Sequence, residues 1–177
     1  MKKPYHVIGI GNAIVDVLAF MPDTFLVEQA MKKGTMMLID EARAESLYAA
    51  MGQAAEVSGG STANTLAGMA SLGARTAFIG KVFDDQLGKI FRHDLNAIGV
   101  EYTTPARTSG LPTARCLICV TPDGQRTMNT YLGAAGEILV ADLDSAPIAK
   151  AQVLYVEGYL WHLPETKKTL KRAVEIA

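Results

Sequence analysis

The chain has 177 residues, and its 17 Lys and Arg against 18 Asp and Glu give a net charge of −1. This balance gives no support to nucleic acid or an anionic membrane as a partner. Hydrophobic residues make up 49% of the sequence, which is enough for one domain with a sizeable core. No apolar run approaches the roughly 20 residues that span a bilayer, and no cleavage site follows the basic N-terminus, so we expect a cytoplasmic protein.

Strands and helices alternate through the first hundred residues. Short apolar runs predict strands at 5–11, 14–20, 34–40 and 74–81. Helical patterns follow at 41–51, 61–72 and 84–98. Asp40 is placed to open the first of these helices, and Asp84 and Asp85 are placed to open the third. Gly73 and Gly99 are placed to end two of them. The alternation is typical of a parallel α/β sheet.

The middle of the chain differs in amino-acid composition from the segments before it. Residues 101–131 are rich in Thr and interrupted by Pro, and strands are predicted at 113–121 and 126–131. Pro122-Asp123-Gly124 between them is a hairpin signal. We interpret this region as a small β subdomain or lid, after which a strand at 151–157 and a helix from Pro164 resume the α/β pattern.

Cys116 and Cys119 form a Cys-x-x-Cys pair, but neither of its usual functions fits. A redox pair needs a helix N-terminus, whereas this pair lies on a predicted strand, where residues three apart point to opposite faces. A structural zinc site needs a second pair of ligands, which the sequence lacks. We therefore expect two packed residues in a reducing compartment.

Other familiar motifs are incomplete. Gly9-Ile10-Gly11 follows a strand, but Ile14 stands where the dinucleotide fingerprint needs a glycine or alanine. The P-loop pattern and the Gly-x-Ser-x-Gly elbow are absent from the sequence. Three histidines without ligand spacing give no metal site: His6, His93 and His162.

The segment Gly59-Gly60-Ser61-Thr62-Ala63-Asn64 lies at a strand-to-helix junction. Two glycines allow a ligand to approach the backbone closely, and a helix N-terminus offers free N–H groups. Asn64 in the first turn supplies a donor and an acceptor suited to a sugar hydroxyl. The alternative is a tight strand-to-helix turn without a ligand.

Asn12 and Asp16 form a second constellation just beyond the first strand. Ligands of open α/β sheets bind at that edge. An Asp within an apolar run is costly to bury without a partner, and a pair of vicinal hydroxyls is one such partner. The alternative is a turn-forming Asn and a hydrogen-bonded structural Asp.

In combination these segments resemble the PfkB family of carbohydrate kinases. The run from GGSTAN to Val100 is similar to the family's N-terminal signature, with Gly80, Asp85 and Gly88 in three of its places and Phe83 where many members have glycine. GIGNAIVD, the Thr-rich hairpin and YVEGYL agree in order and spacing. The resemblance implies a ribokinase-like three-layer α/β sheet with helices on both faces plus a small β-sheet lid.

Within the family, the chain looks most similar to adenosine kinases. The resemblance implies an ATP-dependent kinase that converts adenosine to AMP, with ATP and Mg²⁺ as cofactors. It implies ten substrate-binding residues: Asn12, Asp16, Gly59, Gly60 and Asn64 at the ribose, and Met37, Arg126, Met128, Tyr159 and Leu160 at the lid and apolar wall.

The sequence departs from the family in lacking the Gly-Ala-Gly-Asp motif that carries the catalytic aspartate. Gly133-Ala134-Ala135-Gly136-Glu137 is only faintly similar, and we interpret it as a loop. We therefore expect residues 1–177 to be the N-terminal substrate-binding part, with lid segments near 14–20, 34–40 and 101–132. No catalytic residue is expected in this chain, and the missing half would hold most of ATP and Mg²⁺.

Several alternatives stay open. The acceptor could be a free sugar, as in ribokinases and fructokinases, or the chain could be a non-catalytic sugar- or nucleoside-binding module. A monomer and a lid-mediated homodimer are both compatible with the sequence.

Overall fold

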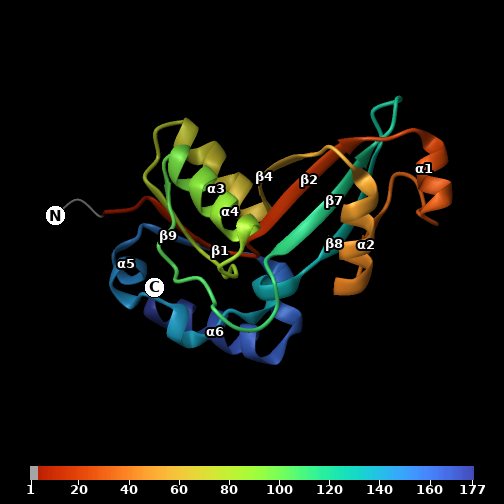
Figure 1. Ribbon diagram of the computed structural model, residues 1–177. Helices are drawn as coiled ribbons and strands as arrows, with labels where there is room; N and C mark the ends of the chain where they lie inside the picture. Colours follow the sequence, from red (N-terminus) through yellow and green to blue (C-terminus); the bar gives the residue numbers. More distant parts are fainter. Residues whose placement is uncertain (1–3) are drawn as a thin grey trace.

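Two β-sheets lie side by side in the molecule, and each combines strands from distant parts of the sequence (Figure 1). The computed structural model describes residues 4–177, without the side chain of His162. The expectation that His162 is not a ligand therefore lies outside the described residues.

The first sheet is parallel throughout, with the strand order β6-β5-β1-β9. Its strands are β1 (Val7–Ile10), β5 (Thr76–Ile79), β6 (Val100–Glu101) and β9 (Val153–Val156). The two central strands, β1 and β5, are buried along their whole length. Near-continuous apolar strands of this kind form where helices cover both faces of a parallel sheet.

Four helices supply that cover (Figure 1). Helices α3 (Ser61–Ser71) and α4 (Gln86–Ala97) lie on one face, and α5 (Ser145–Lys150) and α6 (Pro164–Ile176) lie on the other. Because neighbouring strand residues point to opposite faces, Val7 and Ile8 belong to two different apolar clusters.

The second sheet is mixed and has the strand order β3-β8-β7-β2-β4. Its strands are β2 (Ile14–Phe20), β3 (Met36–Leu38), β4 (Ala55–Gly59), β7 (Ala114–Val120) and β8 (Arg126–Tyr131). One face packs against α1 (Asp23–Glu28) and α2 (Glu41–Met51), where Val15, Val17 and Leu117 are fully buried. β2 alternates between buried and half-buried residues, as a strand with one covered face does.

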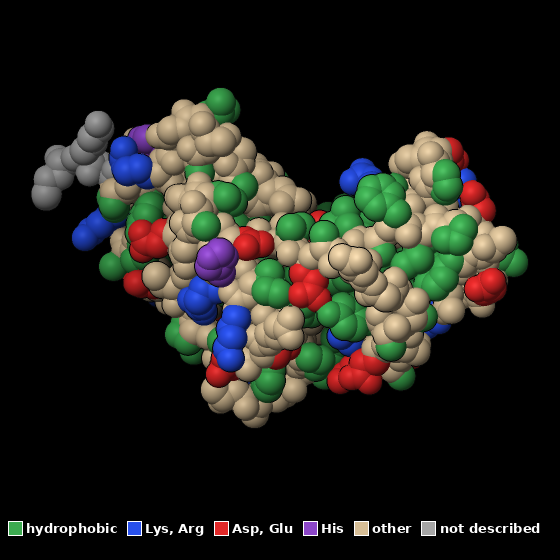
Figure 2. Space-filling model, turned by 45° about the horizontal axis from the view of Figure 1, so that its top comes forward, with side chains coloured by type: hydrophobic (Ala, Val, Ile, Leu, Met, Phe, Trp, Pro, Cys, Tyr) green, Lys and Arg blue, Asp and Glu red, His purple; other side chains and the backbone are tan. Residues whose placement is uncertain are grey.

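The opposite face of the second sheet is open. Its exposed apolar side chains are Phe20, Met36, Leu38 and Val57. Figure 2 shows hydrophobic side chains at the surface of this part of the molecule, across a hollow from the part that contains α3 and α4. An apolar patch of this kind marks a place where a ligand or another part of a protein binds.

The predicted α/β class and most of the elements agree with the structure. β4 is the strand expected to lead into Gly59, whereas α5 was not expected, and residues 133–137 form a 3₁₀-helix, η1 (Gly133–Glu137), in place of the loop. Two further 3₁₀-helices are η2 (Val140–Asp142) and η3 (Gly158–His162). Glu101 pairs with β5 in the first sheet rather than with the hairpin, because β6 continues directly from α4.

The two cysteines lie on β7 as free, buried residues, which confirms the expectation of packed thiols. Cys119 belongs to the covered core, whereas Cys116 accepts a hydrogen bond from Thr130 Oγ1 at 3.3 Å on the open side of the sheet. Burial raises the pKa of the Cys116 thiol to about 11.

Between residues 4 and 177 the structure contains no helix that is both long and apolar enough to cross a membrane. The same residues include no group of three His, Cys, Asp or Glu side chains placed to hold a metal ion.

Candidate functional site

The candidate site lies where β1 and β9 end. After β1 the chain reaches β5 through α3 on one face of the sheet, whereas β9, on the other side of β1, is reached through α5 on the opposite face. The order of strands therefore reverses at β1. Ligands of open α/β sheets bind in the crevice at the carboxyl ends of strands at such a point.

Asn12 and Glu157 meet at this crevice. Asn12 follows β1, Glu157 follows β9, and the side chains are only 3% and 4% exposed. The Asn12 amide nitrogen donates a hydrogen bond to Glu157 Oε1 at 2.5 Å. Since the nitrogen faces Glu157, the carboxamide oxygen of Asn12 is the end that remains for a ligand's hydroxyl group.

Glu157 also binds the N-terminus of α3. Its Oε2 accepts hydrogen bonds from Ser61 Oγ at 2.9 Å, from Thr62 Oγ1 at 3.0 Å and from the Thr62 backbone N–H at 3.4 Å. A buried carboxylate is stable only when several donors replace its water, and these donors do so. Glu157 thus joins β1, β9 and α3 in one network.

Asp16 presents the opposite situation on β2. Burial raises the pKa of its carboxyl group to about 6, and the Arg126 guanidinium opposes that rise. No donor among residues 4–177 makes a hydrogen bond to this carboxylate. Gly59 lies directly against it, and a Cβ at that position would come within 2.4 Å of the Asp16 carboxyl group. The carboxylate is therefore half-buried and prepared to accept hydrogen bonds from a ligand.

Gly60 makes the turn from β4 into α3. Its φ of +94° lies in the left-handed region, and a Cβ there would come within 2.6 Å of the Asn12 carbonyl oxygen. As the N-cap of α3 it offers no side chain to the first N–H groups of the helix, of which Thr62 N–H is bound by Glu157 and the neighbouring ones can serve a ligand. Asn64 lies exposed in the first turn, where its backbone N–H donates to Gly60 O at 2.9 Å.

A cavity of about 440 Å³ opens beside this network. Its lining consists of Asn12, Ile14, Met36, Leu38, Ser61, Thr130, Leu132, Glu157, Gly158 and Tyr159. The polar groups come from the ends of β1 and β9 and the start of α3, and the apolar ones come mainly from the open face of the second sheet. One end of the cavity can bind hydroxyl groups, and the other offers an apolar wall for a planar or apolar group.

Asp16 stands beside this cavity. Ile14, two residues earlier on β2, lines the cavity, and Asp16 follows on the same face. Asp16 pairs with Cys116, and Cys116 pairs with the cavity-lining Thr130. A ligand that fills the cavity can therefore reach Asp16 across one row of the sheet.

The structure does not place all ten expected residues together. Asn12 and Tyr159 line the cavity, and Asp16, Gly59 and Gly60 adjoin the same junction. Arg126 and Met128 lie on β8 at alternate positions from Thr130, so they share its face.

Met37 and Leu160 lie elsewhere. Met37 points to the covered side of β3, into a separate pocket with Met31 and Asn129, and its neighbour Met36 lines the cavity. Leu160 is 1% exposed and packs in the core with Leu170. The strand containing Met37 was expected, but its facing depends on the pairing with β8, which the sequence does not display.

Sequence reasoning missed Glu157. It directly follows β9, as Asn12 follows β1, so the rule that pointed to Asn12 applied to it as well, although β9 is a partly exposed edge strand rather than the buried strand expected from the sequence. The missing information was that β9 is the neighbour of β1. Ser61 was quoted only as part of the glycine segment, and Leu38, Thr130 and Leu132 were not singled out.

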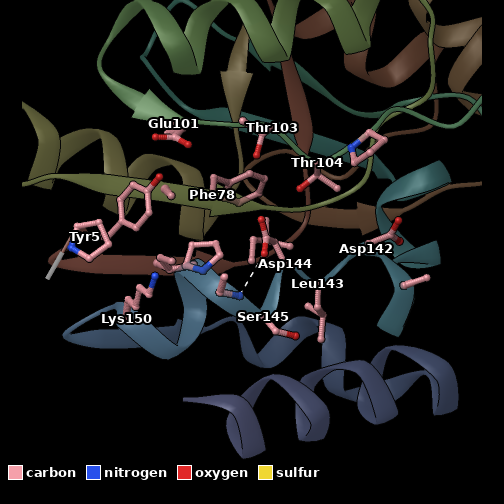
Figure 3. A pocket seen from close by; sticks show the side chains of 18 residues that line it. Tyr5, Phe78, Glu101, Thr103, Thr104, Asp142, Leu143, Asp144, Ser145 and Lys150 are labelled. Atoms are coloured by element: carbon pink, nitrogen blue, oxygen red, sulfur yellow. Dashed lines mark hydrogen bonds between the residues drawn. The ribbon is translucent and has the colours of Figure 1, made fainter.

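A larger cavity of about 740 Å³ lies between the β5–β6 side of the first sheet and α5 (Figure 3). Its acidic groups already have partners. Asp142 forms an ion pair with Lys81, and Asp144 caps α5 by accepting a hydrogen bond from the Ala146 N–H at 3.1 Å. None of the ten expected residues lines this cavity, and it shares no lining residue with the cavity of about 440 Å³.

Comparison with known proteins identifies the family of the chain. The sequence model described as "pfkB family carbohydrate kinase" matches residues 29–177. The crystal structure of adenosine kinase from Sinorhizobium meliloti is 52% identical, with a TM-score of 0.89, over 98% of this chain and 53% of that one. The structure of a probable sugar kinase protein from Rhizobium etli is 47% identical, with a TM-score of 0.90, over 99% and 53%.

Among curated proteins, adenosine kinase 1 of Arabidopsis thaliana is 28% identical over 162 residues. That match covers 86% of this chain and 46% of the plant protein. The chain thus spans about half the length of the curated relatives and solved structures that it matches.

Proposed function

Because the chain belongs to the pfkB family of carbohydrate kinases, we propose that the whole protein is an ATP-dependent kinase that phosphorylates a sugar hydroxyl of adenosine to give AMP. The observation that carries this proposal is the two-part cavity. Hydroxyl-binding groups at Asn12 and the start of α3, both held by Glu157, adjoin an apolar wall large enough for a nucleobase.

The residues of this chain serve to hold the acceptor. Asp16 accepts hydrogen bonds from two neighbouring ribose hydroxyls. Asn12 and the N-terminus of α3 bind the acceptor as well. Met36, Leu38 and Tyr159 enclose the base. Phosphoryl transfer depends mostly on positioning and on charge neutralisation, so a rigid hold on the acceptor contributes directly to the rate.

ATP and Mg²⁺ are proposed to bind mainly outside these 177 residues. The sequence has no P-loop, and the described residues have no cluster of carboxylates that would suit Mg²⁺. No residue of the chain is assigned as the catalytic base. Bound MgATP supplies the phosphoryl group and neutralises the charge that develops on it.

The second sheet is proposed to act as the lid of the site. Its open face carries part of the cavity wall, and contact with a bound acceptor would exclude water from it. This assigns the lid to β2, β3, β4, β7 and β8, which is broader than the three segments expected from the sequence.

A free-sugar kinase is the second candidate. The similarity to a probable sugar kinase favours it, and the polar end of the cavity suffices for a sugar without a base. The experiment measures ATP consumption by the complete protein encoded by the gene that contains this sequence, with adenosine, ribose and fructose offered separately.

Turnover that requires adenosine supports the proposal, and turnover with ribose or fructose alone assigns the sugar-kinase function instead. The 177-residue chain serves as the control, and adenosine binding by this chain without any turnover by the complete protein would identify a binding module.

A further inference from the structure

The segment from Gly80 to Gly88 carries part of the family pattern, yet none of its residues lines the cavity. We propose that Asp85 within this segment is a positioning residue that fixes the start of β7 in the second sheet to α4. In this way it places the cavity wall opposite Asn12 and Glu157. This inference rests on the proposed function for its kinetic consequence, but the attachment itself can be tested without turnover.

Asp85 binds α4 and the start of β7 at the same time. Its Oδ1 accepts the Gly88 N–H at 2.8 Å as the N-cap of α4. The same carboxylate accepts the Thr113 hydroxyl at 2.6 Å through Oδ1 and the Thr113 N–H at 2.9 Å through Oδ2. An N-cap needs only the first of these bonds, so the other two are surplus to helix capping.

Thr113 completes the attachment from the other side. It is 1% exposed, and its hydroxyl accepts a hydrogen bond from the Phe83 N–H at 3.0 Å. Gly88 allows this close approach, because a Cβ there would lie 2.0 Å from the Phe83 carbonyl oxygen. The turn before α4, the first turn of the helix and the start of β7 are therefore packed into one hydrogen-bonded unit.

The return of the β7–β8 hairpin is fastened at the same place. The Ala134 N–H, just after β8, donates to the Pro112 carbonyl oxygen at 2.9 Å. Leu132, two residues before Ala134, lines the cavity, and so does Thr130. Both ends of the hairpin that carries this wall are thus held at residues 112–113.

The attachment reaches the acceptor site through strand pairing. Ala114 follows Thr113 and pairs with the cavity-lining Ile14, and Cys116 pairs with both Asp16 and Thr130. If the start of β7 were no longer held, β7 and β8 would shift together, because the two strands pair along nearly their whole length. A shift of about 1 Å in a substrate-positioning group is enough to reduce the rate greatly.

The test compares Asp85→Asn with Asp144→Asn in the complete protein. Both positions are helix N-caps, but Asp144 caps α5, which lies on the face of the first sheet opposite α3 and α4. Thr113→Val removes the hydroxyl at nearly constant volume, and Thr113→Ser retains it. We expect Asp85→Asn and Thr113→Val to raise the KM for the acceptor about tenfold, and Asp144→Asn and Thr113→Ser to change it less than twofold.

Hydrogen exchange supplies a readout that needs no activity. In Asp85→Asn, the amides of residues 113–117 should exchange at least tenfold faster, while those of β5 keep the wild-type rate. Equal exchange in Asp85→Asn and Asp144→Asn, with equal KM values, would show that Asp85 is only a helix cap and would overturn the inference. If the wild-type protein shows no kinase activity, the proposed function fails, and the exchange contrast still decides the role of Asp85.

Discussion

Two carboxylates stand at the ends of neighbouring parts of the fold, and they are in opposite states. Glu157, at the end of the first sheet, accepts four hydrogen bonds from Asn12, Ser61 and Thr62. Asp16, on the second sheet, accepts none from the described residues, and burial raises its pKa to about 6. A satisfied carboxylate organises a structure, whereas a desolvated one without donors gains most from a ligand that brings hydroxyl groups.

Replacement of Asp16 should have the largest effect on acceptor binding, without loss of stability of the unliganded protein. We expect Asp16→Ala to raise the KM for the acceptor 100-fold or more, because hydrogen bonds to a charged group contribute about 1.5–3 kcal/mol each. Asp16→Asn should raise the free energy of unfolding of the unliganded protein by about 2 kcal/mol at pH 8, since it removes a poorly solvated charge. Steady-state kinetics and urea unfolding measure the two effects.

The contrast between Asp16 and Glu157 would be contradicted if Asp16→Asn lowered the free energy of unfolding of the unliganded protein. That result would mean that Asp16 is a structural carboxylate like Glu157.

Replacement of Glu157 should lower the stability of the protein and should affect acceptor binding less than replacement of Asp16 does. Glu157→Gln places an amide group among donors, so we expect it to destabilise the protein by about 2–3 kcal/mol. The KM should rise about tenfold, because the single acceptor oxygen of glutamine cannot serve both Asn12 and the start of α3. Urea unfolding of the variant checks the first effect, with Glu165→Gln on the exposed side of α6 as the control.

A fully stable Glu157→Gln protein with a large loss of acceptor affinity would instead make Glu157 a direct ligand of the acceptor with no structural role.

The pH dependence should follow Asp16. Its folded pKa of about 6 exceeds the ordinary value of 3.8, so the folded state binds this proton more tightly than the unfolded chain does. The Asp16 contribution therefore favours folding fully below pH 3.8 and is lost as the pH rises through 6. Acceptor binding needs the carboxylate, so the KM should rise about tenfold for each pH unit below 6.

Profiles of kcat/KM against pH for the wild type and for Asp16→Asn test this assignment. The step near pH 6 should be present in the first profile and missing from the second. A step of equal size in both profiles would assign it to another group.

Met36 and Met37 offer the smallest contrast. Met36 lines the cavity and Met37 faces the covered side of β3, so only Met36→Ala should raise the KM for a nucleoside, by about three- to fivefold. Met37→Ala should leave the KM unchanged. Equal effects from the two variants would contradict the observed facing of β3.

The predictions from sequence succeeded where the signal was local. The glycine pair at Gly59 and Gly60 and the N-cap at Asp85 are short-range patterns, and the structure contains both turns. The helix α5 was missed because six residues carry no clear 3.6-residue period. Strand β4 was expected only as an unbounded strand before Gly59, because its polar residues interrupt the apolar pattern, and it pairs with β2 only after a long excursion of the chain.

The candidate site required information that the sequence does not display. Glu157 joins Asn12 only because β9 is the neighbour of β1, which is a property of topology. Met36 rather than Met37 faces the cavity because β3 pairs with β8 in one particular register. A one-residue change of register reverses the face of every side chain on a strand, so such assignments need the paired structure.

The most direct test of the account is the pKa of Asp16, measured by NMR on selectively ¹³C-labelled complete protein with and without the acceptor. We expect a value near 6 in the free protein that falls by more than one unit when adenosine binds, because the hydroxyl groups stabilise the carboxylate. A normal value near 4 in the free protein, or a raised value that the acceptor leaves unchanged, would contradict the proposal that Asp16 holds the acceptor hydroxyls.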